Sequence, residues 1–362
     1  MGIRYDRDSR RATNGPLIFF SDASSEGAFA EEVRGAMVSG LSFYGYRSPN
    51  SPMVSFGSSE GYKIGIGEPG FVVGMFDPFF PYITIPYRNG KKGFTSQSFY
   101  TMPEESTTFE EYSEEVETAI KDLAGERNRK VVLSRVLIRK ESLDIADKFF
   151  DLCERFPDSF VFCFSTPVTG CWIGASPELL LEGKPGILST MALAGTRPSG
   201  SLDEWDEKNI EEQQIVVEYI WKVFQENGFN PEIEATYTRQ SGKIEHICTS
   251  ISVERNDFRK EKLETLLKEL SPTPALCGSP KQFAFEEIKK LEKFDRGCYG
   301  GFCGPFHSLE DFSFNVVLRC ASVNERQYCI YAGGGITAKS DIDKEWEETK
   351  IKISNTFNRV KP

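Results

Sequence analysis

The chain has 362 residues, of which 39% are hydrophobic and 13% aromatic, enough to build one large domain or two smaller ones. Lysine and arginine total 43 against 54 aspartate and glutamate residues, and the formal net charge of −11 argues against nucleic acid or an anionic membrane surface as a partner. The nine cysteines form no C-x-x-C pair, and no apolar run approaches the roughly 18 residues of a membrane helix, so we expect a cytoplasmic protein with reduced thiols and no membrane contact.

Residues 1–100 combine short apolar runs, as in "FVVGMFDPFFPYITIPY", with many Gly, Pro and Ser residues, a pattern typical of strands joined by turns. A helix is predicted over 108–124, because Thr108 and Glu111 form a capping box and Gly125 follows the last turn. Its apolar residues fall on one face: Phe109, Tyr112, Val116, Ile120 and Leu123.

Further along the chain, strands are predicted at 130–138, 159–165, 186–193, 312–318 and 327–332. Helices are predicted at 203–225, 260–270, 280–292 and 343–360, the third with Ser279 as its cap and Pro280 at its first position. There is no internal repeat and no flexible linker, and the helix at 108–124 is the only candidate boundary. We therefore expect a single domain over residues 1–362.

Lys130 stands at the mouth of the strand predicted at 130–138, which is otherwise β-branched and aliphatic. A lysine at a strand end usually extends to water. The chain has only two histidines, however, so acid–base chemistry would fall to another type of residue. From the sequence alone, Lys130 is either a polar strand end or a base.

Two predicted helices carry closely spaced carboxylates. Glu345 and Glu348 lie three residues apart in "DKEWEETKIK", and Glu211 and Glu212 precede the apolar side of the helix at 203–225. Spacing alone favours exposed acidic faces. If one carboxylate from each helix converged, they would instead form an open magnesium site completed by water or substrate oxygens.

Other polar residues follow apolar segments. Glu178, in "GASPELLLEG", is either a helix-start residue or a desolvated proton donor. "MALAGTRPSG" predicts a strand ending in a turn that exposes Thr196 and Arg197, and His246 is compatible with a core histidine. The segment "AGGGITAKSD" resembles a phosphate-binding loop, but Ala338 replaces the glycine needed before the lysine, which argues against nucleotide hydrolysis.

Seven segments together resemble the chorismate-utilising enzymes, in the order and approximate spacing of that family. They are "KVVLSR", "GASPELL", "LAGTRP", "SPTPALCGSPK", "FDRGCYGGFCG", "AGGGITAKSD" and "EWEETKIK". The family includes anthranilate, aminodeoxychorismate, salicylate and isochorismate synthases. The resemblance covers about residues 107–360, the expected catalytic region, whereas residues 1–100 diverge. It implies an α/β (α+β) fold in which two large antiparallel β-sheets pack together with helices on the outside.

The resemblance also implies a site and a cofactor. Glu212 and Glu348 would hold Mg²⁺, with Glu345 in an outer shell. The residues expected to contact chorismate are Thr196, His246, Ala275, Leu276, Tyr299, Arg319, Lys352 and the backbone of Gly333, Gly334 and Gly335. Lys130 would take a proton from the water that attacks C2, and Glu178 would protonate the leaving C4 hydroxyl. A metal and local cations would thus bind a dianion despite the net charge.

Three positions indicate which member the chain resembles. Water-using members carry a lysine at the position of Lys130, and Ala194 stands where aminodeoxychorismate synthases commonly have a nucleophilic lysine. Ala275 stands where salicylate and anthranilate synthases have threonine. The expected activity is isochorismate synthase, an isomerase serving menaquinone or siderophore biosynthesis. The alternatives are a salicylate synthase, which would go on to eliminate pyruvate, and an inactive acidic scaffold of the same fold.

Two positions depart from the family pattern. Ser271 precedes the Pro-Thr pair where the family usually has histidine, and Gln213 follows Glu212 where the family usually has Glu-His. Neither departure removes a proposed ligand or catalytic group. Both concern the surroundings of the metal and the substrate.

Overall fold

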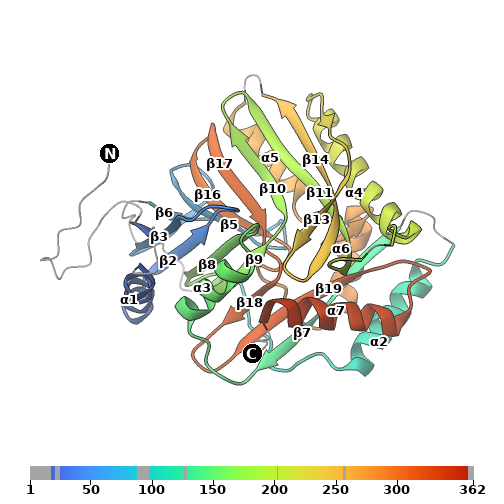
Figure 1. The fold of residues 1–362 in the computed structure, drawn as a ribbon, viewed down its shortest axis with the longest axis horizontal. Helices are drawn as coiled ribbons and strands as arrows, with labels where there is room; N and C mark the ends of the chain where they lie inside the picture. The colour runs from blue at the N-terminus through green and yellow to red at the C-terminus, as the bar shows by residue number, and fades with distance from the viewer. Residues whose placement is uncertain are drawn as a thin grey trace, which may run out of the picture.

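Two large antiparallel sheets form the body of the molecule (Figure 1). The computed structural model describes residues 18–20, 25–87, 98–125, 129–201, 203–255 and 258–357. Every strand pair within the described residues is antiparallel, and the helices lie outside the sheets. The predicted fold class is therefore confirmed. No helix within these ranges is long and apolar enough to cross a membrane.

The first sheet has nine strands. In spatial order they are β1 (Ile18–Phe20), β3 (Val54–Ser59), β2 (Ser42–Arg47), β8 (Phe160–Thr166), β9 (Gly170–Ser176), β18 (Cys320–Val323), β19 (Tyr328–Ile336), β7 (Lys130–Arg139) and β15 (Gly278–Ser279). β19 pairs with β7 over most of its length, so the glycines at 333–335 lie beside the first half of β7.

The second sheet has ten strands, nine of them on its main path. In spatial order they are β12 (Glu232–Ile233), β14 (Ile244–Glu254), β11 (Ile187–Pro198), β10 (Leu179–Lys184), β17 (Asp311–Val316), β16 (Phe302–Ser308), β5 (Gly70–Gly74), β6 (Ile83–Pro86) and β4 (Lys63–Ile64), with β13 (Tyr237–Ser241) also paired to β14.

Strand β8 shows how the sheets pack. Phe160, Phe162 and Phe164 alternate along it and join the core between the sheets, where the ring centroid of Phe164 lies 5.9 Å from that of Phe71 on β5. The residues between them, Val161 and Cys163, belong to a separate cluster with the helices on the outer face. Alternate residues of a strand point to opposite faces, so a strand buried on both faces is apolar throughout.

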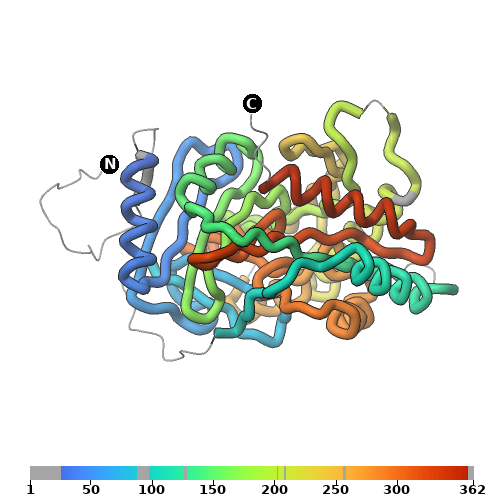
Figure 2. Tube along the Cα trace, turned by 90° about the horizontal axis from the view of Figure 1, so that it is seen from below, coloured from blue at the N-terminus to red at the C-terminus, as the bar shows by residue number. Residues whose placement is uncertain are grey.

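The helices cover the outer faces and ends of the sheets. They are α1 (Ser25–Val38), α2 (Phe109–Asp122), α3 (Ile145–Arg155), α4 (Glu207–Glu226), α5 (Lys260–Leu270), α6 (Lys281–Leu291) and α7 (Ile342–Phe357). α1 packs against α3, α4 against β11 and β14, and α7 against β19 and α2. Figure 2 shows α1 at one end of the molecule and α2 with α7 toward the other.

Most elements predicted after residue 107 are present. The capping box of α2 is complete, with Glu111 N donating to Thr108 Oγ1 over 3.1 Å and Thr108 N donating to Glu111 Oε2 over 3.0 Å. The five predicted strands correspond to β7, β8, β11, β17 and β19, and the helices to α4, α5, α6 and α7. The predicted end of the last helix, Val360, lies outside the described residues.

Three local predictions were wrong. Residues 1–100 are not only strands, because α1 lies among them. The segment Gly195 to Pro198 is not a turn ending a strand: β11 continues through it with a register shift between Ala194 and Arg197, where Gly195 takes a φ of +69°. Ser279 does not cap α6, because it belongs to β15 and pairs with Lys130 of β7, and Pro280 is the N-cap residue of α6.

Candidate active site

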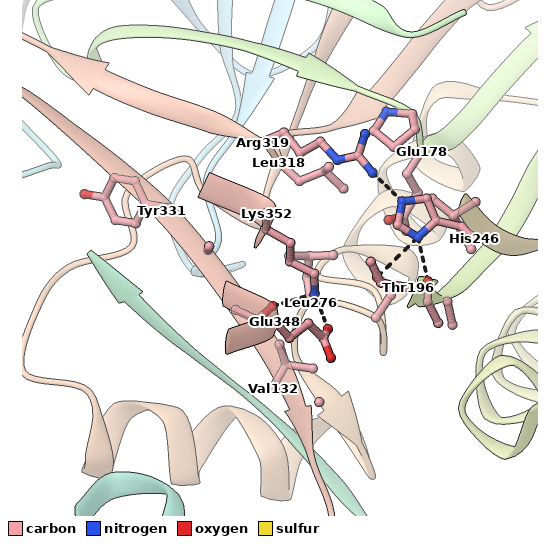
Figure 3. A pocket seen from close by; sticks show the side chains of 18 of the residues that line it. Val132, Glu178, Thr196, His246, Leu276, Leu318, Arg319, Tyr331, Glu348 and Lys352 are labelled. Carbon is pink, nitrogen blue, oxygen red and sulfur yellow. Dashed lines mark hydrogen bonds and ion pairs between the residues drawn. The ribbon is translucent and has the colours of Figure 1, made fainter. Parts of the chain in front are cut away.

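A pocket of about 830 Å³, part of it open to solvent, lies where β7 and β19 meet β11, α4 and α7 (Figure 3). The predicted site residues that line it are Lys130, Glu178, Thr196, Glu212, His246, Ala275, Leu276, Tyr299, Arg319, Gly333, Gly335, Glu348 and Lys352. Gly334 and Glu345 do not line it. Segments far apart in the sequence thus converge on one cavity.

Lys130 is not a strand end that extends to water. The residue is only 2% exposed, and its Nζ lies 3.3 Å from Glu212 Oε2 on α4. Val131 points to the other face of the strand, into the cluster with α2 and α6, so strand alternation turns Lys130 toward the pocket. The ammonium is therefore held inside the cavity by a carboxylate.

Glu178 follows β9 and precedes β10, not a helix, and the residue is 2% exposed. Burial raises the pKa of its carboxyl to about 8, while the Thr273 hydroxyl and the charges of Lys130 and Arg319 act to lower it. Glu178 N donates to Ser176 Oγ over 3.2 Å, which fixes the backbone here. A carboxylic acid that keeps its proton near neutral pH can act as a proton donor.

Arg319 and His246 form a fixed pair on one wall of the pocket (Figure 3). Arg319 donates to His246 Nε2 and to Ser241 Oγ. Because guanidinium can only donate, Nε2 must accept, so Nδ1 carries the ring hydrogen and donates it to Gly195 O over 2.5 Å. Burial and the charge of Arg319 hold the pKa of His246 well below its ordinary value, and the ring is neutral.

The predicted metal ligands lie on two helices, but lysines hold them in this structure. Glu212 on α4 pairs with Lys130, and Glu348 on α7 pairs with Lys352, whose Nζ lies 2.7 Å from Glu348 Oε1. Glu345 is buried against β19, where a Cβ on Gly334 would lie 3.1 Å from its Oε2. Within the described ranges, no group of three His, Cys, Asp or Glu side chains could hold a metal ion by itself.

The donor set nevertheless suits magnesium. Mg²⁺ usually binds through one or two carboxylates and takes its other oxygens from water or substrate. Glu212 and Glu348 line the same pocket and offer oxygen donors of this kind. Lys130 and Lys352 are the groups that a bound cation would replace as partners of these carboxylates.

Two glycines of β19 contact the lysines of the pocket. A Cβ on Gly335 would lie 2.4 Å from Lys130 Cε and 3.0 Å from Glu212 Oε1, closer than real side chains approach. Gly333 O accepts from Lys352 Nζ over 2.7 Å. The triple glycine was predicted to let the backbone approach a ligand, and in this structure Gly335 also makes room for the buried side chain of Lys130.

Sequence reasoning missed several residues of the pocket and its support. Tyr331, Leu318, Thr356 and Phe357 line the cavity, and Thr273 and Ser241 hold Glu178 and Arg319. Tyr331 stacks on the predicted residue Tyr299, with ring centroids 5.4 Å apart. The only local signal was the Pro-Thr-Pro segment around Thr273, which stands two residues before Ala275.

Together the fold and the pocket define a candidate enzyme site with a buried lysine, a buried acid and a buried guanidinium. Comparison with known proteins agrees. The model of a family described as chorismate binding enzyme matches residues 86–360. Isochorismate synthase EntC of Escherichia coli (strain K12) is 32% identical over 272 residues, 70% of this chain and 67% of that protein.

A second relative, the vibriobactin-specific isochorismate synthase of Vibrio cholerae, is 29% identical over 240 residues, 62% of this chain and 60% of that protein. The solved structure of MenF, the menaquinone-specific isochorismate synthase from Escherichia coli, superposes with a TM-score of 0.69 at 22% identity, covering 87% of each chain. This last match supports the fold alone. The chain belongs to the chorismate binding enzyme family.

Proposed function

We propose that this protein is an isochorismate synthase, an isomerase that converts chorismate to isochorismate by adding water at C2 and releasing the C4 hydroxyl. The observation that carries the proposal is the joint placement of Lys130 and Glu178, both buried, in one pocket. A lysine beside a pocket suits activation of water, and a protonated carboxyl suits departure of a hydroxyl. The relatives named isochorismate synthases support this assignment.

In this proposal, Lys130 accepts the proton of the attacking water. Its ammonium is paired with Glu212 in this structure, so it acts as the base only after its own proton has left. Glu178 delivers its proton to the departing hydroxyl, and its raised pKa keeps that proton in place near neutral pH. Arg319, held by His246 and Ser241, offers a fixed positive charge to a substrate carboxylate.

We further propose that Mg²⁺ is the cofactor, held by Glu212 and Glu348 with Glu345 behind them. When bound, it would supply the positive charge that orients the ring carboxylate of chorismate. Lys352 lies beside Glu348 and Gly333, at the same end of the pocket. The isochorismate would serve menaquinone or siderophore biosynthesis, and nine free cysteines fit a reducing, cytoplasmic setting.

The test is product identification. Purified protein is incubated with chorismate and Mg²⁺, and the products are separated by chromatography while released pyruvate is assayed. We expect isochorismate without pyruvate, and a Glu178→Gln variant that is folded but inactive. Salicylate with equimolar pyruvate would instead identify a salicylate synthase. Chorismate that stays unchanged would reject the proposal and favour the inactive scaffold.

A further inference from the structure

Glu178 has a neighbour that the proposed mechanism does not use. The hydroxyl of Thr273 lies 3.1 Å from Glu178 Oε1, and both residues are buried, at 5% and 2% exposure. Thr273 does not line the pocket, so its hydroxyl reaches a substrate through Glu178 and not by direct contact. The backbone carbonyl of Glu178 accepts from Val316 N, and the Thr273 hydroxyl contacts the carboxyl of Glu178 and not this carbonyl.

The backbone around Thr273 forms a tight turn. The carbonyl of Thr273 accepts from Leu276 N over 3.0 Å and from Cys277 N over 2.8 Å. Ala275 and Leu276, which belong to the same turn, line the pocket. The turn therefore brings the pocket wall and the Thr273 hydroxyl together on one short segment.

The chemistry of this contact is directional. A threonine hydroxyl that donates to Oε1 makes Oε1 the accepting, carbonyl-like oxygen of a protonated carboxyl. The acidic proton then resides on Oε2, the carboxyl oxygen that Thr273 does not contact. Without the hydroxyl, either oxygen can carry the proton, and the side chain can rotate about its last bond.

We propose that Thr273 is a positioning residue that fixes the Glu178 carboxyl and assigns its acidic proton to Oε2. This inference rests on the proposed function, because it gives the Glu178 proton a task. The contact should also lower the pKa of Glu178, an effect that is independent of turnover. Thr273 is thus distinct from Ala275, two residues later, which contacts the pocket directly.

Several ionisable groups surround Glu178 besides Thr273. The positive charges of Lys130 on β7 and Arg319 before β18 favour its ionised form, and the phenol of Tyr299 and the thiol of Cys248 on β14 also face it. These groups are unchanged by substitution at 273. A change in the titration of Glu178 after loss of the hydroxyl can therefore be assigned to that hydroxyl.

The first experiment compares Thr273→Val, which is nearly isosteric, with Thr273→Ser, which keeps the hydroxyl. For Thr273→Val we expect kcat to fall about tenfold with little change in KM, and the alkaline limb of the pH profile to move up by about one pH unit, because the carboxylate has lost a donor. Thr273→Ser should retain most of the wild-type rate and its pH profile.

The matched control is Thr190→Val. Thr190 is 4% exposed and its hydroxyl donates to Leu180 O over 2.6 Å, so the change removes a buried hydroxyl bond that does not reach a carboxyl. It should lower stability and leave the pH profile unchanged. If Thr273→Val does not fold, Thr273→Ala removes the same hydroxyl. A valine or alanine variant with the wild-type pH profile and kcat would overturn the proposal.

A second measurement does not need activity. Folding raises the pKa of Glu178, so the folded protein holds this proton more tightly than the unfolded chain, and stability is lost as the pH rises toward about 8. In Thr273→Val this loss should extend to higher pH, and in Glu178→Gln it should shrink to the part contributed by Glu115, whose pKa burial also raises to about 8. If wild type leaves chorismate unchanged, the proposed function fails, while urea unfolding across this pH range still decides the role of Thr273.

Discussion

Lys130 shows how one residue changes meaning between sequence and structure. At the start of β7 it is buried with Glu212, and placing two charges away from water has a desolvation cost that a surface pair avoids. A lysine that served only as a polar strand end could stay in water and avoid this desolvation cost. A residue that activates water gains a defined position beside the cavity.

We expect Lys130→Gln to lower turnover by roughly 10²–10⁴-fold, the usual contribution of a positioned base, with a smaller change in KM. Steady-state kinetics with chorismate measure this. Lys130→Arg should do no better, because guanidinium keeps its proton at any working pH. A glutamine variant with near-normal turnover and the wild-type pH profile would assign the base role to another group.

Gly335 allows a second prediction at the same scale. A Cβ here would lie 2.9 Å from Lys130 Nζ, so Gly335→Ala should displace the ammonium and reduce kcat by about 100-fold, the effect of a misplacement of about 1 Å. The control is Gly35→Ala in α1, where nothing lies within 4 Å of a new Cβ and activity should be unchanged. Equal kcat values for Gly335→Ala and Gly35→Ala would contradict the close packing of Gly335 against Lys130.

At the scale of elements, Arg135 of β7 links that strand to helix α7. Arg135 Nε donates to Thr349 Oγ1 over 2.6 Å, and its guanidinium carbon lies 3.9 Å from the centre of the Trp346 ring. Both contacts are to the turn of α7 that carries Glu345 and Glu348. The position of the proposed metal ligands therefore depends on a residue that does not line the pocket.

We expect Arg135→Leu to cost about 2 kcal/mol of stability, from the lost hydrogen bond and cation–π contact, and to weaken Mg²⁺ activation. Urea unfolding and the Mg²⁺ dependence of the initial rate measure the two effects. Arg34→Leu is the matched control, because it removes an exposed ion pair with Asp144 that contributes about 0–1 kcal/mol. Unchanged Mg²⁺ activation in Arg135→Leu would show that the contacts of Arg135 with α7 do not position the metal ligands.

Elements with a regular pattern could be predicted from the sequence. The capping box and apolar stripe of α2 and the β-branched run of β7 specify their structures locally. Helix α1 was missed because Gly27 and Gly35 weaken its helical pattern, which is instead stabilised by packing, as where Phe29 stacks on Phe149 with ring centroids 4.8 Å apart. The bulge after Ala194 depends on pairing with β14, which local sequence does not encode.

The site could be predicted only in part for a related reason. Spacing placed Glu345 and Glu348 on one helix face, yet only Glu348 lines the pocket, whereas Glu345 is buried beside Gly334 of β19. The resemblance to the family supplied the residues that spacing left ambiguous, such as Glu212. Supporting contacts such as that of Thr273 with Glu178 follow from tertiary packing, and the Pro-Thr-Pro segment around Thr273 does not indicate which residue its hydroxyl contacts.

At the scale of the whole molecule, ligand binding should stabilise the fold, because the pocket draws its walls from both sheets and from α4 and α7. With Glu178→Gln in the presence of Mg²⁺, chorismate at about 100 times its dissociation constant should add about 2.7 kcal/mol to the free energy of unfolding. Thermal unfolding measures the shift. Excess chelator should remove most of it, and an undiminished shift in chelator would reject the metal proposal.

The pairing of β7 with β19 has a consequence for synthesis of the protein in the cell. The two strands are separated by about 190 residues, which a ribosome adding about 5–20 residues per second takes about 10–40 s to make. During that interval β7 lacks its longest partner, and an unpaired apolar strand is a template for aggregation. The exposure of β7 ends only when the glycine-rich strand β19, which also shapes the pocket, has been synthesised and pairs with it. Chaperone binding to the growing chain would therefore protect it most before β19 emerges from the ribosome.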